Sequence, residues 1–428
     1  MNALHTTDVE FSQLGLNDSL LQSLNDNGLT HCTPVQAECL PISLAGKDVA
    51  GQAQTGTGKT AAFLLTIMQH LLTTPERPGR KQQQPRAIII SPTRELAIQI
   101  HKDAVMLNSH TGLALGLVYG GVDYEKQRNS LGEKIDILIG TPGRLIDYHK
   151  QHVYSLKGIE IVVLDEADRM FDLGFISDIR YMFRSMPTPE NRLNMLFSAT
   201  LSHRVTELAY EHMNSPEKVI INPDQVTAEN VKQTLYHVAN DEKIPLLLGL
   251  MKRIDPKRSI VFVNTKRAAE KVWSYLESNG YHSAVLSGDV PQNKRTRLFK
   301  EFTDGQLPVL VATDLAARGL HVPEVSHVFN YDLPQNAEDY VHRIGRTARA
   351  GASGDAVSFA CEEYVYSLME IEEYIGHKLP ASEIVADLLV EPLPPVRVER
   401  KKHAGGAGKG RNNSGGRNRS NRNSSNRR

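Results

Sequence analysis

One segment of the sequence has the residue types and spacing of a phosphate-binding loop. Residues 53–60 read AQTGTGKT, follow a short run at 48–52 and open a helix-compatible stretch at 61–72. Backbone N–H groups at a helix N-terminus bind phosphate oxygens, while a lysine neutralises β- and γ-phosphate charge and a threonine hydroxyl reaches Mg²⁺. The strict pattern begins with glycine where this chain has alanine, at a less demanding position than Gly58. We therefore expect nucleotide contacts from the whole loop, which comprises Ala53, Gln54, Thr55, Gly56, Thr57, Gly58, Lys59 and Thr60.

Carboxylates follow a second apolar run, where a phosphate loop needs them. The run Ile159–Leu164 is typical of a buried strand and ends in Asp165, Glu166, Ala167 and Asp168. Nucleoside triphosphatases hold their metal with an acid at the carboxyl end of a neighbouring strand. We expect Asp165 to hold Mg²⁺ through water and Glu166 to orient and deprotonate the attacking water. A solvated acidic turn is the alternative for these residues alone, but together with the loop they predict ATP or GTP hydrolysis.

Both motifs need a parallel sheet to position them, and the sequence predicts two such sheets. Short runs rich in Ile, Val and Leu alternate with helix-compatible segments, a pattern typical of strands buried on both faces. A first helix is expected at 17–27, and strands are expected at 87–91, 135–140, 159–164, 195–198, 259–264, 284–286, 309–312, 327–330 and 356–360. A polar stretch at 222–230 interrupts this alternation. We expect an α/β fold with two tandem, doubly wound domains at 1–222 and 231–396, joined by a linker at 223–230.

Charge is distributed unevenly along the chain. The 49 basic residues balance the 49 acidic ones, yet residues 401–428 contain nine Lys or Arg and no acid. Residues 1–400 therefore carry a net charge of −9. The Gly, Asn, Ser and Arg of residues 397–428 cannot bury enough apolar surface to offset the entropy of ordering. We expect a disordered basic tail that binds a polyanion, with a merely solubilising end as the alternative.

Cysteine usage and hydropathy argue against a disulfide-stabilised, a secreted or a membrane-spanning protein. Three cysteines, Cys32, Cys39 and Cys361, cannot form a disulfide framework, and none belongs to a C-x-x-C pair. No run of 18 apolar residues is present, and the first ten residues lack the order of a signal peptide. We expect a cytoplasmic protein with free thiols and no membrane segment.

Further short motifs accompany the phosphate loop and the acidic motif at 165–168. Together they resemble the motifs of a DEAD-box RNA helicase. The first half contains TPVQ at 33–36, PTRELA at 92–97, GG at 120–121, TPGR at 141–144, DEAD at 165–168 and SAT at 198–200. The second half contains QNKR at 292–295, ATD at 312–314, ARG at 317–319 and HRIGRTAR at 342–349. The resemblance extends over about residues 11–375. The stretches 194–201 and 329–354 are most similar to the bacterial helicases of the RNA degradosome.

This resemblance implies two RecA-like domains that close over ATP, Mg²⁺ and RNA, with the RNA single-stranded or in a short duplex and bound without sequence preference. Nucleotide contacts are implied for Phe11, Leu29, Gln36, Gly319 and His321. Arginine fingers are implied at Arg346 and Arg349, beside the catalytic Glu166, Asp165 and Lys59. RNA-backbone contacts are implied for Arg94, Gly121, Thr141, Arg144, Arg295 and Thr313. Coupling between the two sites is implied for Ser198, Thr200, Asp168 and His342.

Three positions depart from the family pattern. Leu29 replaces an aromatic residue, Ala348 replaces a glycine between the finger arginines, and His321 replaces an aspartate expected at the ribose. The resemblance still implies RNA-stimulated ATP hydrolysis, local unwinding of short duplexes in RNA degradation, and ribonuclease E of the degradosome as a partner of the C-terminal domain. An ATP-gated RNA clamp with little strand separation is the alternative. A small-molecule kinase would leave the second domain without a role.

Overall fold

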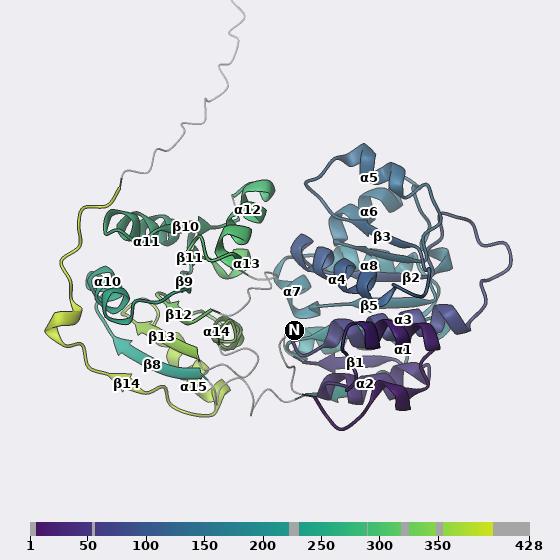
Figure 1. Ribbon diagram of the computed structural model, residues 1–428, viewed down its shortest axis with the longest axis horizontal. Helices are drawn as coiled ribbons and strands as arrows, with labels where there is room; N and C mark the ends of the chain where they lie inside the picture. Colours follow the sequence, from purple (N-terminus) through teal and green to yellow (C-terminus); the bar gives the residue numbers. More distant parts are fainter. Residues whose placement is uncertain are drawn as a thin grey trace, which may run out of the picture.

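Two α/β domains lie side by side, each built on a seven-stranded sheet (Figure 1). The computed structural model describes residues 6–53, 56–221, 231–288, 290–317, 325–347 and 354–396. Every named strand pairs parallel to its neighbours. The expected fold of two parallel, doubly wound domains is confirmed. The expected linker at 223–230 and the basic tail at 397–428 lie outside the described residues.

The first sheet has the strand order β3-β4-β2-β5-β6-β1-β7. Its strands are β1 (Val49–Gln52), β2 (Ala87–Ile90), β3 (Leu115–Val118), β4 (Ile137–Gly140), β5 (Ile161–Leu164), β6 (Leu193–Ser198) and β7 (Glu217–Ile220). Its α-helices are α1 (Asp18–Asp26), α2 (Pro34–Leu44), α3 (Lys59–Thr73), α4 (Arg94–Leu107), α5 (Tyr124–Ser130), α6 (Pro142–Lys150), α7 (Ala167–Asp172), α8 (Ile176–Arg184) and α9 (His203–His212). Short 3₁₀ helices lie at η1 (Phe11–Leu14), η2 (Leu156–Gly158) and η3 (Pro189–Asn191).

The second sheet has the order β10-β11-β9-β12-β13-β8-β14. Its strands are β8 (Val231–His237), β9 (Ser259–Phe262), β10 (Ser283–Leu286), β11 (Val309–Ala312), β12 (His327–Asn330), β13 (Gly354–Ala360) and β14 (Ala381–Ser382). Its helices are α10 (Lys243–Ile254), α11 (Lys266–Ser278), α12 (Gln292–Thr303), α13 (Asp314–Ala317), α14 (Ala337–Ile344), α15 (Leu368–Ile375), η5 (Val365–Ser367) and η6 (Ala386–Leu388).

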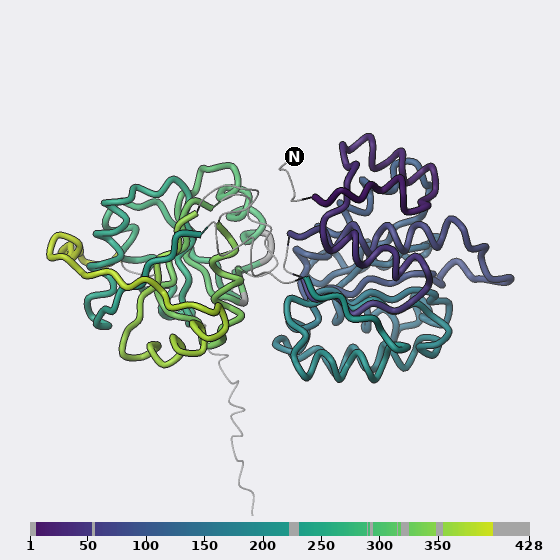
Figure 2. The backbone as a smooth tube through the Cα atoms, turned by 90° about the horizontal axis from the view of Figure 1, so that it is seen from below, coloured from purple at the N-terminus to yellow at the C-terminus, as the bar shows by residue number. Residues whose placement is uncertain are grey.

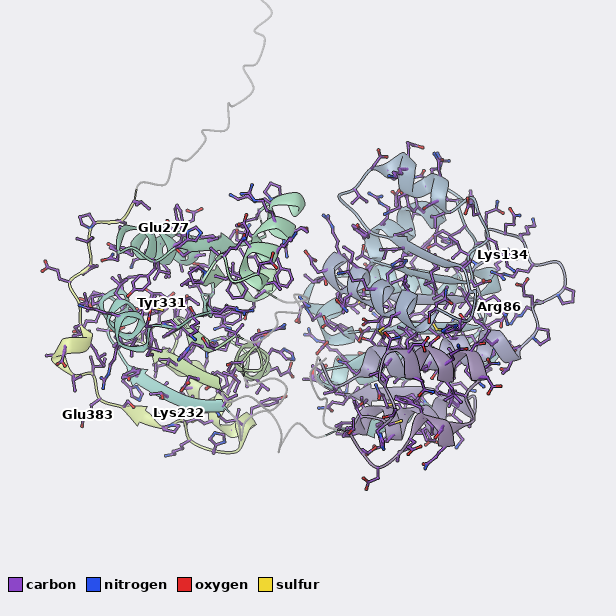
Figure 3. The ribbon with its side chains drawn as sticks, in the orientation of Figure 1. Arg86, Lys134, Lys232, Glu277, Tyr331 and Glu383 are labelled. Atoms are coloured by element: carbon purple, nitrogen blue, oxygen red, sulfur yellow. The ribbon has the colours of Figure 1, made fainter. Side chains whose placement is uncertain are left out.

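The residues that form these elements follow simple local rules. The central strands β2, β4, β5 and β6 are buried along their whole length, as continuous apolar runs predict. The first helix begins after Asn17, whose side chain accepts a hydrogen bond from the Ser19 N–H at 3.0 Å. Apolar side chains fill both faces of each sheet, and Tyr331 lies in the middle of the second domain (Figure 3). Among the described residues no helix is long and apolar enough to cross a membrane.

The parallel arrangement brings the functional motifs to one edge of the first sheet. Because parallel strands share a direction, the loops after β1, β2, β4, β5 and β6 all emerge at the carboxyl edge. Contacts from the second domain reach this edge: Arg295 on α12 lies 3.5 Å from Glu95 on α4. The perpendicular view of Figure 2 again shows the two domains side by side. Residues between the domains are therefore positioned by both sheets.

Candidate functional site

The phosphate loop joins the end of β1 to the start of α3 through left-handed glycines. Gly56 and Gly58 have φ angles of +90° and +97°. A Cβ atom at Gly58 would lie 2.6 Å from Gln36 Nε2 and 2.7 Å from Thr33 Oγ1, so both backbone conformation and space require glycine there. Buried Ala53 donates its N–H to the Ser198 carbonyl at 3.0 Å, which ties the loop to β6. Gln54 and Thr55 lie outside the described residues.

Lys59, the first residue of α3, directs its ammonium into the loop. The buried Nζ atom donates to the Ala53 carbonyl at 2.6 Å. Burial by itself raises the pKa of three nearby carboxyl groups, Asp165, Glu166 and Asp168, and the Lys59 charge opposes this effect in each of them. Thr60 follows it in the first turn of α3. The lysine thus lies between the loop and the acidic end of β5.

Asp165 is a deeply buried acid with incomplete charge compensation. Its exposure is 3%, and burial, with smaller contributions from the Glu166 and Asp168 charges, raises its pKa to about 6 against the lowering effect of Lys59 and of the Glu166 N–H. Glu166 N–H donates to Asp165 Oδ1 at 3.0 Å. A buried carboxylate that its neighbours do not fully stabilise fits a divalent cation.

Glu166 is held ionised in a strained backbone position. Its φ angle is +51°, which is uncommon for a residue with a side chain. Burial raises the pKa of Glu166, but the charges of Arg169, Lys59 and Arg346 and a hydrogen bond from Arg169 outweigh burial and lower that pKa below its ordinary value. Arg169 Nη1 lies 2.7 Å from Glu166 Oε2. Arg169 was not among the residues expected to act, although its position three residues after Glu166, at the start of α7, could have indicated the pair.

The residues expected to couple the two sites meet at a cavity between the domains. Asp168 N–H donates to Ser198 Oγ at 3.2 Å. A cavity of about 350 Å³ is lined by Asp168 and Thr200 of the first domain and by His342 and Glu338 of α14. Thr200 Oγ1 is buried and has no hydrogen-bond partner among the described residues. Three of the four expected coupling residues therefore line one cavity, and Ser198 lies directly beside Asp168.

Two arginines of the second domain have different positions. Arg346 is buried, and its charge reaches Glu166 strongly enough to lower the pKa of that carboxyl group. Arg343, for which no role was expected, forms two hydrogen bonds of 2.7 Å to Asp314 and one of 2.8 Å to Asn264 Oδ1. Arg343 thereby anchors α14, which precedes Arg346, to the first residue of α13 and to the loop after β9. Arg349, Gly319 and His321 lie outside the described residues, as does Ala348.

The residues expected near the nucleotide base are engaged by the protein itself. Gln36 Oε1 accepts from the Thr33 N–H at 2.8 Å, and its Nε2 donates to the Gly58 carbonyl at 3.0 Å. Phe11 is only 3% exposed and packs in the same apolar cluster as the partly buried Leu29. Gln36 is therefore linked directly to the phosphate loop, and its contact with a base, like those of Phe11 and Leu29, stays a prediction.

The expected RNA contacts follow strands of both domains. The Arg94 guanidinium packs so closely on Gly121 that a Cβ atom there would lie 2.2 Å from Nη1. Thr141 occupies the N-cap position of α6 without a capping hydrogen bond from its side chain, while Arg144 donates to Tyr148 Oη and Gln127 Oε1, both at 3.0 Å. In the second domain, Arg295 Nη2 donates to the Ala316 carbonyl at 3.2 Å. The Arg295 Nε atom has no hydrogen-bond partner among the described residues. Thr313 directly precedes α13, the helix that contains Ala316. Arg295 retains a donor for a further acceptor.

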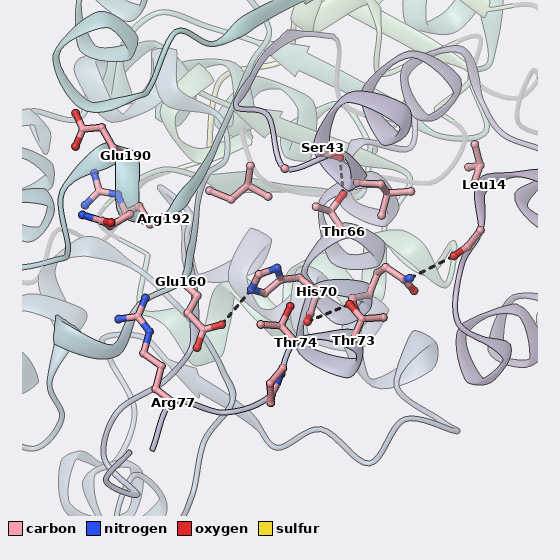
Figure 4. A pocket seen from close by; sticks show the side chains of 17 residues that line it. Leu14, Ser43, Thr66, His70, Thr73, Thr74, Arg77, Glu160, Glu190 and Arg192 are labelled. Atoms are coloured by element: carbon pink, nitrogen blue, oxygen red, sulfur yellow. Dashed lines mark hydrogen bonds and ion pairs between the residues drawn. The ribbon is translucent and has the colours of Figure 1, made fainter. Parts of the chain in front are cut away.

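A larger cavity, of about 610 Å³, lies at the opposite edge of the first sheet (Figure 4). It contains His70 and Glu160, whose Nε2 and Oε2 atoms are 3.0 Å apart, together with Arg77 and Thr74. None of the expected functional residues lines it. Cavity size alone therefore does not identify the functional site of this domain.

Comparisons with known proteins agree with this geometry. The DEAD/DEAH box helicase family model matches residues 33–208, and that of the helicase conserved C-terminal domain matches residues 242–351. The chain is 56% identical to the ATP-dependent RNA helicase RhlB of Shewanella woodyi, over 97% of this chain and 94% of the relative. It is 57% identical to that of Psychromonas ingrahamii, over 94% and 96%.

Solved structures show the same similarity. Dbp5 of S. cerevisiae bound to RNA and ADP BeF3 has a TM-score of 0.77 and 30% identity, and the similarity covers 87% of this chain and 95% of Dbp5. Mss116p bound to single-stranded RNA and AMP-PNP has a TM-score of 0.76 and 28% identity, over 90% and 82% of the two chains.

Proposed function

The chain belongs to the DEAD-box helicases, and we propose that it hydrolyses ATP when RNA is bound, in order to separate short RNA duplexes during RNA degradation. One observation carries the proposal: a phosphate loop, two buried carboxylates and an arginine of the second domain converge at one edge of the first sheet. Arg346 comes from the other domain and still lowers the pKa of Glu166. The chemical site is complete only when the two domains are together.

The hydrolytic step follows from the protonation states in this site. Glu166, whose pKa is lowered, stays ionised at neutral pH and can accept a proton from the attacking water. Lys59 lies where it would neutralise β- and γ-phosphate oxygens. Arg346 would stabilise the negative charge that develops on the transferred phosphoryl group, an effect worth about 10³–10⁵ in rate in enzymes of this class.

Mg²⁺ fits the same site. Asp165, a buried carboxyl group whose pKa lies near 6, gains the missing stabilisation of its anion from a divalent cation. Asp165, through water, and Thr60 would hold the metal. Mg²⁺ bound there would neutralise phosphate oxygens, in support of Lys59.

RNA would bind across both domains and thereby favour closure. Arg94 on the Gly121 turn and Arg295 on α12 are basic groups near the domain boundary, and the Arg295 Nε has no partner in the described part of the chain. Contacts of this kind go to phosphate and ribose, which carry little sequence information. Because RNA that contacts both domains stabilises their closed arrangement, ATP hydrolysis should depend on RNA.

The biological setting is part of the proposal. The relatives at 56–57% identity are named RhlB, and the sequence resemblance associates such bacterial helicases with the RNA degradosome. We therefore include ribonuclease E as a partner, docked on the second domain, and the cytoplasm as the location.

Paired ATPase and unwinding assays test the function. The purified full-length chain should hydrolyse ATP several-fold faster with single-stranded RNA than without it, and it should separate a duplex of about one helical turn only when ATP is present. Lys59→Ala serves as the negative control, since it removes the charge that binds phosphate. RNA-stimulated hydrolysis without strand separation would favour the clamp, and hydrolysis indifferent to RNA would refute the proposal.

A further inference from the structure

One segment of the second domain exposes large apolar side chains beside acidic ones. Tyr366 in η5 and Met369 in α15 are 83% and 77% exposed, and Tyr374 is 46% exposed. Glu370 and Glu373, which are also exposed, lie between them in the sequence. These five residues are called the α15 surface below. Large apolar side chains gathered on one short segment are typical of an interaction site.

The opposite side of α15 packs against the hydrophobic core of the second domain. Ile371 is fully buried, and Leu368 and Ile375 pack in the same cluster as Tyr340 and Ile344 of the α14 segment. At 3.6 residues per turn, Met369, Glu370 and Glu373 fall on the other side of the helix. Figure 1 places α15 at the lower margin of the second domain, on the other side of that domain from α11 and α12. The α15 surface is therefore not required for folding of the core.

The charge of this segment selects the chemistry of an occupant. Residues 362–375 contain five glutamates and no Lys or Arg. Glu362 accepts from the Asn240 N–H and Glu372 from the Leu379 N–H, but no ion pair is found for Glu370 or Glu373 among the described residues. A concentration of negative charge repels RNA phosphates and attracts a cationic partner.

We propose that the α15 surface docks a short arginine-bearing segment of a partner protein. A guanidinium group can stack on the exposed Tyr366 ring while it donates to Glu370 or Glu373, and an apolar side chain next to it can cover Met369. The inference rests on the ribonuclease E partnership proposed above and adds the surface and the chemistry of the contact. Because α15 packs on α14, which carries His342, the docked segment would be connected to the inter-domain cavity by one helix pair.

Binding measurements with the full-length chain and full-length ribonuclease E test this surface. Two double variants are compared with the wild type, namely Tyr366→Ala with Met369→Ala and Glu370→Lys with Glu373→Lys. Each should raise the dissociation constant about tenfold or more, as truncation of an interface anchor does. Tyr210→Ala is the matched control, since Tyr210 is 69% exposed on α9 of the first domain, and it should bind like the wild type. RNA-stimulated ATPase activity should stay unchanged in all three variants, which also verifies folding.

The chemistry of the contact has its own readouts. The weakening caused by the two lysine substitutions should shrink as salt is raised from about 0.05 to about 0.5 M, because ions then screen the repulsion over a Debye length that falls from ~14 to ~4 Å. Among overlapping peptides that span ribonuclease E, those that bind the wild type but not the variants should contain arginine.

Each contrary result has a distinct meaning. Wild-type affinity for ribonuclease E in both double variants would overturn the α15 surface and leave the partnership intact. No binding of ribonuclease E by the wild type would refute the partnership and this inference, while the ATPase and unwinding assays would still report on the helicase function. Weaker RNA binding by Tyr366→Ala with Met369→Ala would make the surface an RNA site instead. Tighter binding of a 397–428 peptide than of ribonuclease E would identify the chain's own tail as the occupant.

Discussion

Replacement of Glu160 by glutamine should destabilise the first domain by about 3 kcal/mol at neutral pH. Glu160 directly precedes β5, the strand that Asp165 follows. Arg86 donates from Nε to Oε1 at 2.9 Å and from Nη2 to Oε2 at 2.8 Å. The same guanidinium donates to the carbonyls of Leu71 and Thr74 at the end of α3. This ion pair therefore joins the far ends of the two elements that carry the phosphate loop and the acids that we propose act in catalysis.

The magnitude follows from the proton affinity of the carboxyl group. Burial raises the pKa of Glu160, but hydrogen bonds and charges from His70 and Arg86 outweigh it and lower the pKa from 4.5 to about 2. Each tenfold change in proton affinity is worth about 1.4 kcal/mol, which gives about 3 kcal/mol in total. Because the pKa is depressed in the folded state, this stabilisation is present above about pH 5 and is lost as the pH falls toward 2.

Urea unfolding at two pH values measures the effect. The chain has a single tryptophan, Trp273, which lies in the second domain, so its fluorescence reports on that domain while circular dichroism reports on both. Glu160→Gln should move only the circular-dichroism transition, and its deficit should fall to less than half at pH 3. The exposed Glu133→Gln is the matched control and should change neither signal. An equal deficit at pH 7 and pH 3, or a shifted Trp273 transition, would refute the reasoning.

Four further outcomes are expected. Glu166→Gln should keep ATP and RNA binding but lose about 10²–10⁴ in RNA-stimulated turnover, since an amide cannot accept the proton; turnover at the wild-type rate would remove Glu166 from the mechanism. Arg346→Ala should lower turnover about 10³-fold or more while ATP affinity without RNA stays unchanged, as equilibrium nucleotide binding would verify. Gly121→Ala should weaken RNA binding in a filter assay, because its Cβ would displace Arg94, whereas nucleotide affinity should not change. Deletion of residues 401–428 should raise the RNA concentration needed for half-maximal ATPase activity, while turnover at saturating RNA is retained. The salt dependence of RNA binding should become less steep, by about 0.7 in log–log slope for each phosphate that the tail had neutralised.

Local sequence was sufficient to predict the strands that are buried on both faces of the sheet. Runs such as Ile161–Leu164 are apolar throughout, so their prediction needs no partner strand. The helix over Asp18–Asp26 was predictable because Asn17 and the leucine spacing act within a few residues. Strands β3, β7, β8 and β14 were not predicted, since their burial alternates or is slight and depends on what lies beside them.

The candidate site divides in the same way. The phosphate loop, the acids after β5 and the family were predictable from the sequence, because they depend on residue types at fixed short spacings. Which of these groups meet depends on the tertiary structure. It paired Glu166 with Arg169, tied Ala53 to Ser198 and anchored Arg343 on Asp314 and Asn264. It also placed Arg346 of the second domain where its charge acts on Glu166. The contact between Ala53 and Ser198 joins residues 145 positions apart, and the order of strands in the sheet, which no local pattern encodes, determines the distance between them.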